Sequence, residues 1–201
     1  MFITYEGIDG SGKTTLIRLF SDLLRDKSVD HIVTREPANL PPASISAKGL
    51  ETELDFFIAD RKNHIKNVIE PALNSGKIVL CDRFQDSTIA YQGYGRQMAL
   101  EILEQAASGI TLKPDLTFLL DLPVEMAKER ICNRNHGETT GLREIFDDET
   151  YAFHTRVRNG YLELAKKETD RFVILDASKK PEDLLNNMLF YFNKINGNRH
   201  A

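Results

Sequence analysis

The sequence predicts an α/β protein in which helices cover both faces of a parallel five-stranded sheet. Segments with strand and helix character alternate along the 201 residues, which is typical of βαβ units. Two expected strands, 77–82 and 115–121, are continuous apolar runs, as strands buried on both faces are. Neither a repeat nor a linker interrupts the chain, so we expect a single domain over residues 1–201.

The N-terminal part of the chain is expected to hold two strands and two helices. Residues 2–5 are bulky, β-branched or aromatic, and residues 31–34 form a second short strand. Between them apolar residues recur at helical spacing, at Leu16, Ile17, Leu19, Phe20, Leu23 and Leu24. Prolines and small residues indicate a loop over 38–49. Residues 51–73 indicate a long helix, which Pro71 should kink or shorten.

The remaining chain continues the alternation. Strands are expected at 77–82, 115–121 and 172–176, and helices at 100–108, 124–134, 151–167 and 181–193. The last helix begins with a proline and has acidic residues in its first turn, as helix N-termini do. The polar, glycine-bounded stretch 135–141 indicates a mobile loop.

Composition excludes several classes of function. The net charge of −4 argues against a surface for duplex nucleic acid. Cys81 and Cys132 have no spacing motif, which suggests a reducing compartment and no disulfide framework. No apolar run approaches the length that spans a membrane, and the first motif begins too early for a cleavable signal. We therefore expect a cytoplasmic protein without nucleic-acid or membrane partners.

The first motif lies between the first strand and the first helix. Residues 7–14, GIDGSGKT, fit the pattern G-x-x-x-x-G-K-[ST] of a phosphate-binding loop, which predicts a P-loop NTPase-type sheet. Backbone N–H groups of such a loop and the following helix N-terminus bind phosphate. Lys13 can reach the β- and γ-phosphates, and the Thr14 hydroxyl can bind Mg²⁺. The expected ATP-binding residues are Gly7, Ile8, Asp9, Gly10, Ser11, Gly12, Lys13, Thr14 and Thr15. The alternative is a glycine-rich turn that binds nothing.

A second acidic position follows the buried strand at 77–82. Asp82 and Arg83 stand at its carboxyl end, where ligands bind in open α/β sheets. Asp82 can hold Mg²⁺ through its water shell, and Arg83 can neutralise phosphate oxygens. The alternative is a surface salt bridge at a strand end.

Several longer stretches resemble bacterial thymidylate kinases over nearly the whole chain. They are FITYEGIDGSGKTT (2–15), TREP (34–37), ADR (59–61), DRFQDSTIAYQGYGR (82–96), KPDLTFLLD (113–121), RVRNGYLEL (156–164) and VILDAS (173–178). The resemblance implies a nucleoside monophosphate kinase-like fold and transfer of the γ-phosphoryl group of ATP to dTMP, giving dTDP and ADP for dTTP synthesis. It also implies Mg²⁺ as cofactor and a homodimer.

The resemblance assigns the phosphate-binding residues. Lys13 and Thr14 match the family's ATP-phosphate and Mg²⁺ groups. Asp9 matches the acid that meets the deoxyribose 3′-hydroxyl and the acceptor-phosphate region. Arg35 and Arg83 match arginines that hold the acceptor phosphate. No general base is expected, because the acceptor phosphate is already anionic near neutral pH.

The resemblance also assigns the residues around the base. Phe57 matches the aromatic that stacks on thymine, with Phe56 as the alternative if Phe57 belongs to the core. We favour Phe57, because it lies one helical turn from Arg61. Arg61 matches the guanidinium that reaches O4, and Thr88 the polar residue that faces N3.

Two further residues are expected near the sugar. Tyr91 matches the aromatic that crowds a ribose 2′-hydroxyl, and Gln92 lies in the same pocket wall. The alternative for Tyr91 is packing under the turn at 93–95. The loop at 38–49 is shorter than in relatives, so the wall of the acceptor site and the strictness of substrate choice are expected to differ.

The lid is expected over residues of about 134–148. Relatives with no arginine in the phosphate loop usually place a catalytic arginine in the lid, but Ile145 stands at that position here. We expect Arg143 to meet the charge that develops during transfer, and Arg134 is the alternative, which otherwise binds ATP.

Three rival functions are open at this point. The nearest is a kinase for another or several deoxynucleoside monophosphates. A GTP-hydrolysing switch needs an N-K-x-D motif, and the stretch at 193–196, NKIN, lacks the acid. The third is a nucleotide-binding protein without activity. An assay with ATP, Mg²⁺ and each monophosphate separates the three.

Overall fold

The predicted fold class is confirmed by the computed structural model, which describes residues 1–38, 43–46, 48–134 and 148–199. Five strands form one sheet in the order β2-β3-β1-β4-β5, and every neighbouring pair is parallel. Their bounds are β1 Phe2–Glu6, β2 His31–Arg35, β3 Ile78–Asp82, β4 Leu116–Asp121 and β5 Phe172–Asp176. The carboxyl ends of β1, β3 and β4 therefore lie side by side in the middle of the sheet.

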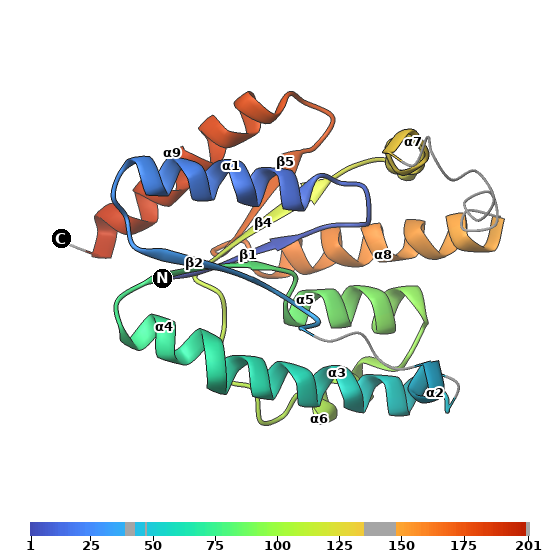
Figure 1. Ribbon diagram of the computed structural model, residues 1–201. Coiled ribbons are helices and arrows are strands. Elements are labelled where there is room, and N and C mark those ends of the chain that lie inside the picture. The colour runs from blue at the N-terminus through green and yellow to red at the C-terminus, as the bar shows by residue number, and fades with distance from the viewer. Residues whose placement is uncertain (39–42, 47, 135–147, 200–201) are drawn as a thin grey trace.

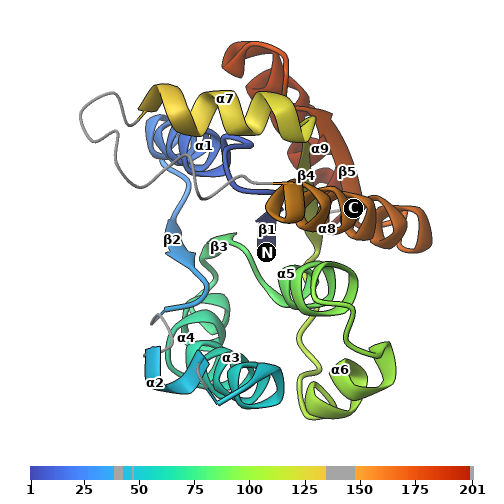
Figure 2. The same cartoon turned by 90° about the vertical axis from the view of Figure 1, so that its right-hand side faces the viewer.

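Helices cover both faces of this sheet (Figure 1; Figure 2). Helices α1 (Lys13–Asp26) and α9 (Pro181–Arg199) pack together on one face. Helices α4 (Glu70–Asn74) and α8 (Asp148–Lys167) pack on the other. The remaining helical elements are α2 Ala43–Ser46, α3 Leu50–His64, η1 Ile65–Ile69, α5 Gln85–Thr88, η2 Ile89–Gly95, α6 Leu100–Ala106 and α7 Val124–Arg134.

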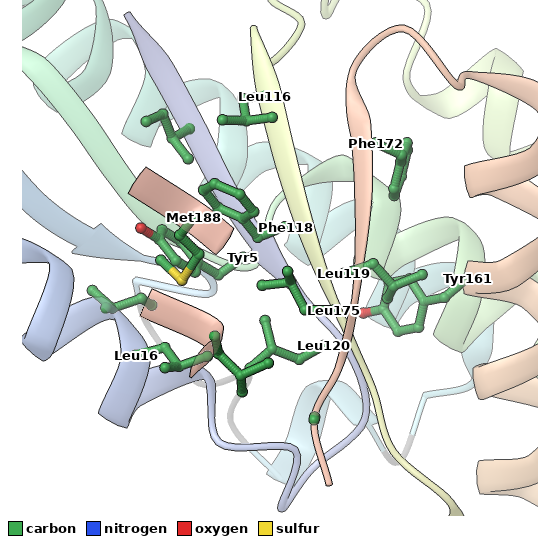
Figure 3. Close-up of a cluster of buried hydrophobic side chains, with 14 of the residues drawn as sticks. Tyr5, Leu16, Leu116, Phe118, Leu119, Leu120, Tyr161, Phe172, Leu175 and Met188 are labelled. Carbon is green, nitrogen blue, oxygen red and sulfur yellow. The ribbon is translucent and has the colours of Figure 1, made fainter. Parts of the chain in front are cut away.

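The core is divided by the sheet, because successive strand residues point to opposite faces. Tyr5, Leu16, Phe118 and Met188 gather on the face that α1 and α9 cover (Figure 3). Leu119 lies on the other side, near Tyr161 of α8 (Figure 3). All of these side chains are buried, so the strands that carry the site stand on a rigid base.

Pro71 neither ends the long helix nor stands at a break in it. Helix α3 continues through η1, a π-helical turn, into α4, which ends at Asn74. Pro71 lies in the first turn of α4. The wider i→i+5 bonding just before the proline lets the chain pass a residue without an N–H donor. The expected early stop is therefore wrong, and the helix departs from α geometry at this π-helical turn.

Two further segments differ from expectation. The proline-rich segment 38–49 contains the short helix α2 rather than loop alone. Residues 85–95, for which we expected only a turn at 93–95, form the continuous helical pair α5 and η2. Gly93 and Gly95 have low helix propensity, which argues against a helix in this stretch. Their small size, however, lets neighbouring elements pack closely against this helix. A Cβ on Gly95 would lie 2.6 Å from the Phe153 ring, so α8 packs directly on this helix.

Candidate active site

The phosphate loop lies in the turn between β1 and α1. Its conformation depends on glycines with left-handed φ values, +137° at Gly7 and +82° at Gly10. A Cβ would lie 2.6 Å from the Leu120 carbonyl oxygen at Gly7 and 2.7 Å from the Ala127 carbonyl oxygen at Gly10. The loop is therefore wedged between the end of β4 and helix α7, where no larger residue fits.

Lys13 is folded back onto the loop. Its Nζ donates to the carbonyl oxygens of Gly7 at 3.0 Å and Ile8 at 3.1 Å. Burial, together with the charge of Arg83, lowers the pKa of Lys13 to about 8. A bound phosphate would favour the charged form again. The ammonium group is thus positioned for an anion at the mouth of the loop.

Asp82 and Thr14 meet at the end of β3. The Thr14 hydroxyl donates to Asp82 Oδ2 at 3.2 Å. Asp82 Oδ1 is buried and has no hydrogen-bond partner among the described atoms. A carboxylate oxygen with unused lone pairs beside a hydroxyl fits Mg²⁺, which takes few protein ligands and keeps several waters. The described residues contain no cluster of three or more His, Cys, Asp or Glu side chains that could hold a metal ion.

Arg83 is the centre of the site. Its Nη2 donates to Asp9 Oδ1 at 2.8 Å and to the Tyr91 hydroxyl at 2.9 Å, and its Nη1 donates to Ser87 and Tyr161. The Tyr91 hydroxyl in turn donates to Asp9 Oδ2. Burial alone would raise the pKa of Asp9, but the charges of Arg83 and Lys13 lower it below its ordinary value. Asp9 is therefore ionised and its charge is balanced.

A second carboxylate, Glu6, lies beneath Arg83 at the end of β1. It is fully buried and accepts hydrogen bonds from the Phe84 N–H, the Ser87 hydroxyl and the Tyr161 hydroxyl. Burial and the nearby Asp86 raise the pKa of Glu6 to about 7, against the lowering effect of the Ser87 and Tyr161 hydrogen bonds and of the Arg83 charge. Glu6 is therefore mainly ionised only above about pH 7.

Two cavities open on either side of Arg83, which lines both together with Asp9 and Glu36. The first, here the aromatic cavity, has a volume of about 170 Å³. Its lining contains seven of the eight residues expected to bind the acceptor nucleotide, which are Asp9, Phe57, Arg61, Arg83, Thr88, Tyr91 and Gln92. Phe56 lies outside the described lining, with its ring centroid 6.1 Å from that of Phe57.

Arg61 is locked into the wall of the aromatic cavity. Its Nε donates to Glu36 Oε2 at 2.7 Å, and its Nη2 donates to the Thr88 hydroxyl oxygen at 3.0 Å. Glu36 also contacts His64 Nδ1 at 3.0 Å. Arg61 Nη1 is buried and has no partner among the described atoms. A buried guanidinium with an unused donor is a place where a ligand acceptor would be strongly favoured.

The second, here the phosphate-loop cavity, has a volume of about 420 Å³ and follows the loop from Asp9 to Leu16. Arg35 lies here, exposed, and not in the aromatic cavity, because β2 ends beside Asp82. Gly7 and Ile8 line neither cavity, and the Ile8 side chain is in the core. Only the backbone of these two residues is placed to contribute.

Several residues of the site were not foreseen. Arg130 lines the phosphate-loop cavity and donates to the Ala177 carbonyl oxygen at 2.8 Å. Its spacing of four residues from Arg134 on one helix face was the available indication. Glu36 and Ser87 line the aromatic cavity. Glu6 and Tyr161 do not line it, but they are hydrogen-bonded to each other, and Tyr161 accepts from Arg83. Ser87 lies four residues after Arg83, but nothing in the sequence pairs Glu6 with Tyr161.

The expected lid falls mostly outside the described residues. Arg143 and Ile145 lie in the segment 135–147, of which nothing is described. Arg134 is the last residue of α7, and its side chain is likewise not described. The assignments of Arg143 and Arg134 stay predictions.

Comparison with known proteins gives one consistent result. A family model described as Thymidylate kinase matches residues 5–188. A thymidylate kinase from Desulfovibrio desulfuricans is 46% identical, with 92% of this chain and 91% of the relative covered. One from Geotalea daltonii is 44% identical, covering 90% and 91%. One from Desulfosudis oleivorans is 41% identical, covering 97% of each chain.

Proposed function

The chain belongs to the thymidylate kinase family, and from that membership we propose which residues of the two cavities carry out the reaction. The enzyme transfers the γ-phosphoryl group of ATP to dTMP, giving dTDP and ADP. ATP occupies the phosphate-loop cavity and dTMP the aromatic cavity. Because both cavities share Asp9 and Arg83, the two phosphates meet there.

One observation carries the assignment of the acceptor base. Arg61 lines the aromatic cavity with an unused buried donor, Nη1, next to the Thr88 hydroxyl. Thymine presents an acceptor, O4, beside a donor, N3–H, and this edge complements an arginine N–H beside a hydroxyl oxygen. Phe57 offers a face for stacking, which is indifferent to the identity of the base.

ATP, the phosphoryl donor, is proposed to bind through the phosphate loop and through the Thr14 and Asp82 side chains. Lys13 and the loop N–H groups hold the β- and γ-phosphates of ATP. Thr14 and Asp82 would hold Mg²⁺, which neutralises phosphate charge when bound. Arg35, whose expected partner was the acceptor phosphate, lies instead in the phosphate-loop cavity, so we propose that it acts on phosphates from that side.

Catalysis relies on positioning and on neutralising charge. Arg83 is held by Asp9 and Tyr91 at the junction of the cavities, and it is proposed to bind the acceptor phosphate. Tyr91, whose hydroxyl donates to Asp9, is likewise proposed to lie beside the sugar. No side chain is assigned as general base, because the acceptor phosphate is an anion before transfer.

A further positive charge that meets the transferring phosphoryl group is assigned to the lid, residues of about 134–148. We propose that Arg143 meets the transferring group and that Arg134 is the alternative. Arg143→Ala is then expected to lower kcat by at least about 10²-fold with little change in the KM for dTMP, because the contact forms mainly in the transition state. Steady-state kinetics of Arg143→Ala and Arg134→Ala decide between them. Near-normal kcat in both variants would remove the lid from the mechanism.

The assembly and location of the enzyme are also proposals. By the resemblance noted above, we propose a homodimer in the cytoplasm that does not bind nucleic acid. No helix in the described part of the chain is long and apolar enough to cross a membrane. Light scattering of the purified enzyme tests the homodimer, and a mass of one chain would contradict it.

A pair of neighbouring phenylalanines tests the acceptor site. Phe57→Ala is expected to raise the KM for dTMP by about 10- to 100-fold, because base stacking on an aromatic contributes roughly 1–3 kcal/mol. Phe56→Ala is the matched control, since Phe56 precedes Phe57 in the same helix but lies outside the described lining. Steady-state kinetics with dTMP varied measure both. A larger increase in Phe56→Ala than in Phe57→Ala would move the stacking residue to Phe56.

A further inference from the structure

Glu6 is connected to Arg83 through two hydroxyl groups. Ser87 Oγ and the Tyr161 hydroxyl donate to Glu6 Oε2 at 2.6 and 2.9 Å. The same two oxygens accept from Arg83 Nη1 at 3.2 and 3.1 Å. Figure 3 shows the Tyr161 hydroxyl pointing from α8 toward the sheet. Glu6, which touches neither cavity, is thus one step from the guanidinium that faces both.

The direction of the hydrogens in this cluster follows from the charge on Glu6. A hydroxyl has one hydrogen and two lone pairs. The Ser87 and Tyr161 hydroxyl oxygens also lie 2.7 Å from each other, and either can donate to the other. When Glu6 is a carboxylate, the two hydrogens turn toward Glu6 or toward the other hydroxyl oxygen, so lone pairs of both oxygens are left for Arg83 Nη1. Nη2 binds Asp9 and Tyr91 on the opposite side, so all four Nη hydrogens of Arg83 have acceptors. The guanidinium is then fixed in one orientation.

Glu6 also fixes the backbone that carries Arg83. Arg83 has a φ of +70°, in the left-handed region that a residue with a side chain rarely adopts. The N–H of the next residue, Phe84, donates to Glu6 Oε1 at 2.8 Å, and the Arg83 N–H donates to the Tyr5 carbonyl oxygen at 3.0 Å. Such strain persists where surrounding bonds hold it, and strained residues gather at active sites.

The neighbouring acid, Asp86, is occupied elsewhere. Asp86 forms a bidentate ion pair with Arg171, whose Nη1 and Nη2 each donate to one Asp86 carboxylate oxygen at 2.8 Å. Of these two acids, Glu6 is therefore the one that shares the hydroxyl groups of Ser87 and Tyr161 with Arg83.

We propose that Glu6 is a positioning residue for dTMP binding, which orients Arg83 toward the acceptor phosphate by setting the hydrogens of Ser87 and Tyr161. The inference rests on the proposed role of Arg83 in holding that phosphate. It assigns a function to a side chain that meets neither substrate.

Glu6→Gln is the most selective way to disturb this arrangement. A glutamine keeps the shape but has one acceptor and one donor end. If its oxygen faces the Phe84 N–H, its NH₂ donates to Ser87 and Tyr161. One hydroxyl can then donate to the other, 2.7 Å away, but the oxygen that accepts both bonds has no lone pair left for Arg83. If the glutamine amide is flipped, its NH₂ faces the Phe84 N–H, a donor that cannot reverse. In either orientation at least one hydrogen bond around Glu6 or Arg83 is lost, while the side-chain volume hardly changes.

The test is a double-mutant cycle between Glu6 and Arg83, with steady-state kinetics for dTMP and ATP. Glu6→Gln is expected to raise the KM for dTMP at least about tenfold and to leave the KM for ATP within about twofold, because charge-assisted bonds to the acceptor are affected. In an Arg83→Ala background, Glu6→Gln should change kcat/KM for dTMP less than about threefold, since its effect passes through Arg83. Glu163→Gln, at an exposed carboxylate on α8, is the control and should match wild type.

The outcomes separate this inference from the proposed function. If Arg83→Ala retains normal kcat/KM for dTMP, the role of Arg83 itself is wrong and the inference falls with it. If Arg83→Ala is impaired but Glu6→Gln has the same effect in both backgrounds, Glu6 contributes only to folding and the inference alone is wrong. Should Glu6→Gln fail to fold, Tyr161→Phe keeps the ring and removes one acceptor of Arg83. A normal KM for dTMP in Tyr161→Phe would then overturn the inference.

Discussion

Lys13→Ala is expected to lower kcat by at least about 10³-fold while leaving the protein folded. The ammonium group of Lys13 lies at the mouth of the phosphate loop, held by two loop carbonyl oxygens, where the charge of the transferring group develops. Alanine removes this charge from a largely dry site, where an ionic contact is worth far more than in water. Initial rates of ADP formation with saturating dTMP and ATP measure the loss.

The control for this prediction is Lys27→Ala. Lys27 is an exposed lysine just after the other end of α1, so the variant carries the same change in net charge away from the loop. Thermal unfolding of both variants shows whether the fold is kept. Turnover at the wild-type rate by folded Lys13→Ala protein would show that the loop lysine has no part in the transfer.

The second large effect is expected in the choice of acceptor. We predict that kcat/KM for dTMP exceeds that for dCMP by at least about 10³-fold. Cytosine presents an NH₂ donor where thymine presents O4, and Arg61 can offer only N–H donors to it. Because Arg61 is held by Glu36 and Thr88, it cannot turn away, and its buried donor stays unpaired. Sites that hydrogen-bond a substrate reject analogues that lack the partner by large factors. Steady-state kinetics with each monophosphate measure the ratio.

Most of the fold could be predicted because strand and helix periods are local signals. The bounds of β5 and α7 agree with expectation to the residue, since both combine a clear period with sharp ends. The helical pair at 85–95 was missed because Gly93 and Gly95 oppose helix locally. Its stability comes from packing against α8, which a local pattern does not contain.

The candidate site likewise contains residues that could be predicted from the sequence and residues that could not. Contiguous motifs indicated the loop lysine and Arg83, and seven of the eight residues expected around the acceptor line one cavity. Glu6 could not be found, because its partner Tyr161 is 155 residues away and joins it only through the packing of α8. Arg35 was expected at the acceptor and lies in the other cavity, because the sequence does not tell which side of a strand end an exposed side chain takes.

We propose that the aromatic cavity selects thymine through Arg61 and Thr88. The most direct measurement is kcat/KM for dTMP, dUMP, dCMP and dGMP at saturating ATP and Mg²⁺. We expect the highest value for dTMP. We expect a value about tenfold lower for dUMP, which lacks only a methyl group, and values at least about 10³-fold lower for dCMP and dGMP. A kcat/KM for dGMP or dCMP comparable to that for dTMP would contradict the claim.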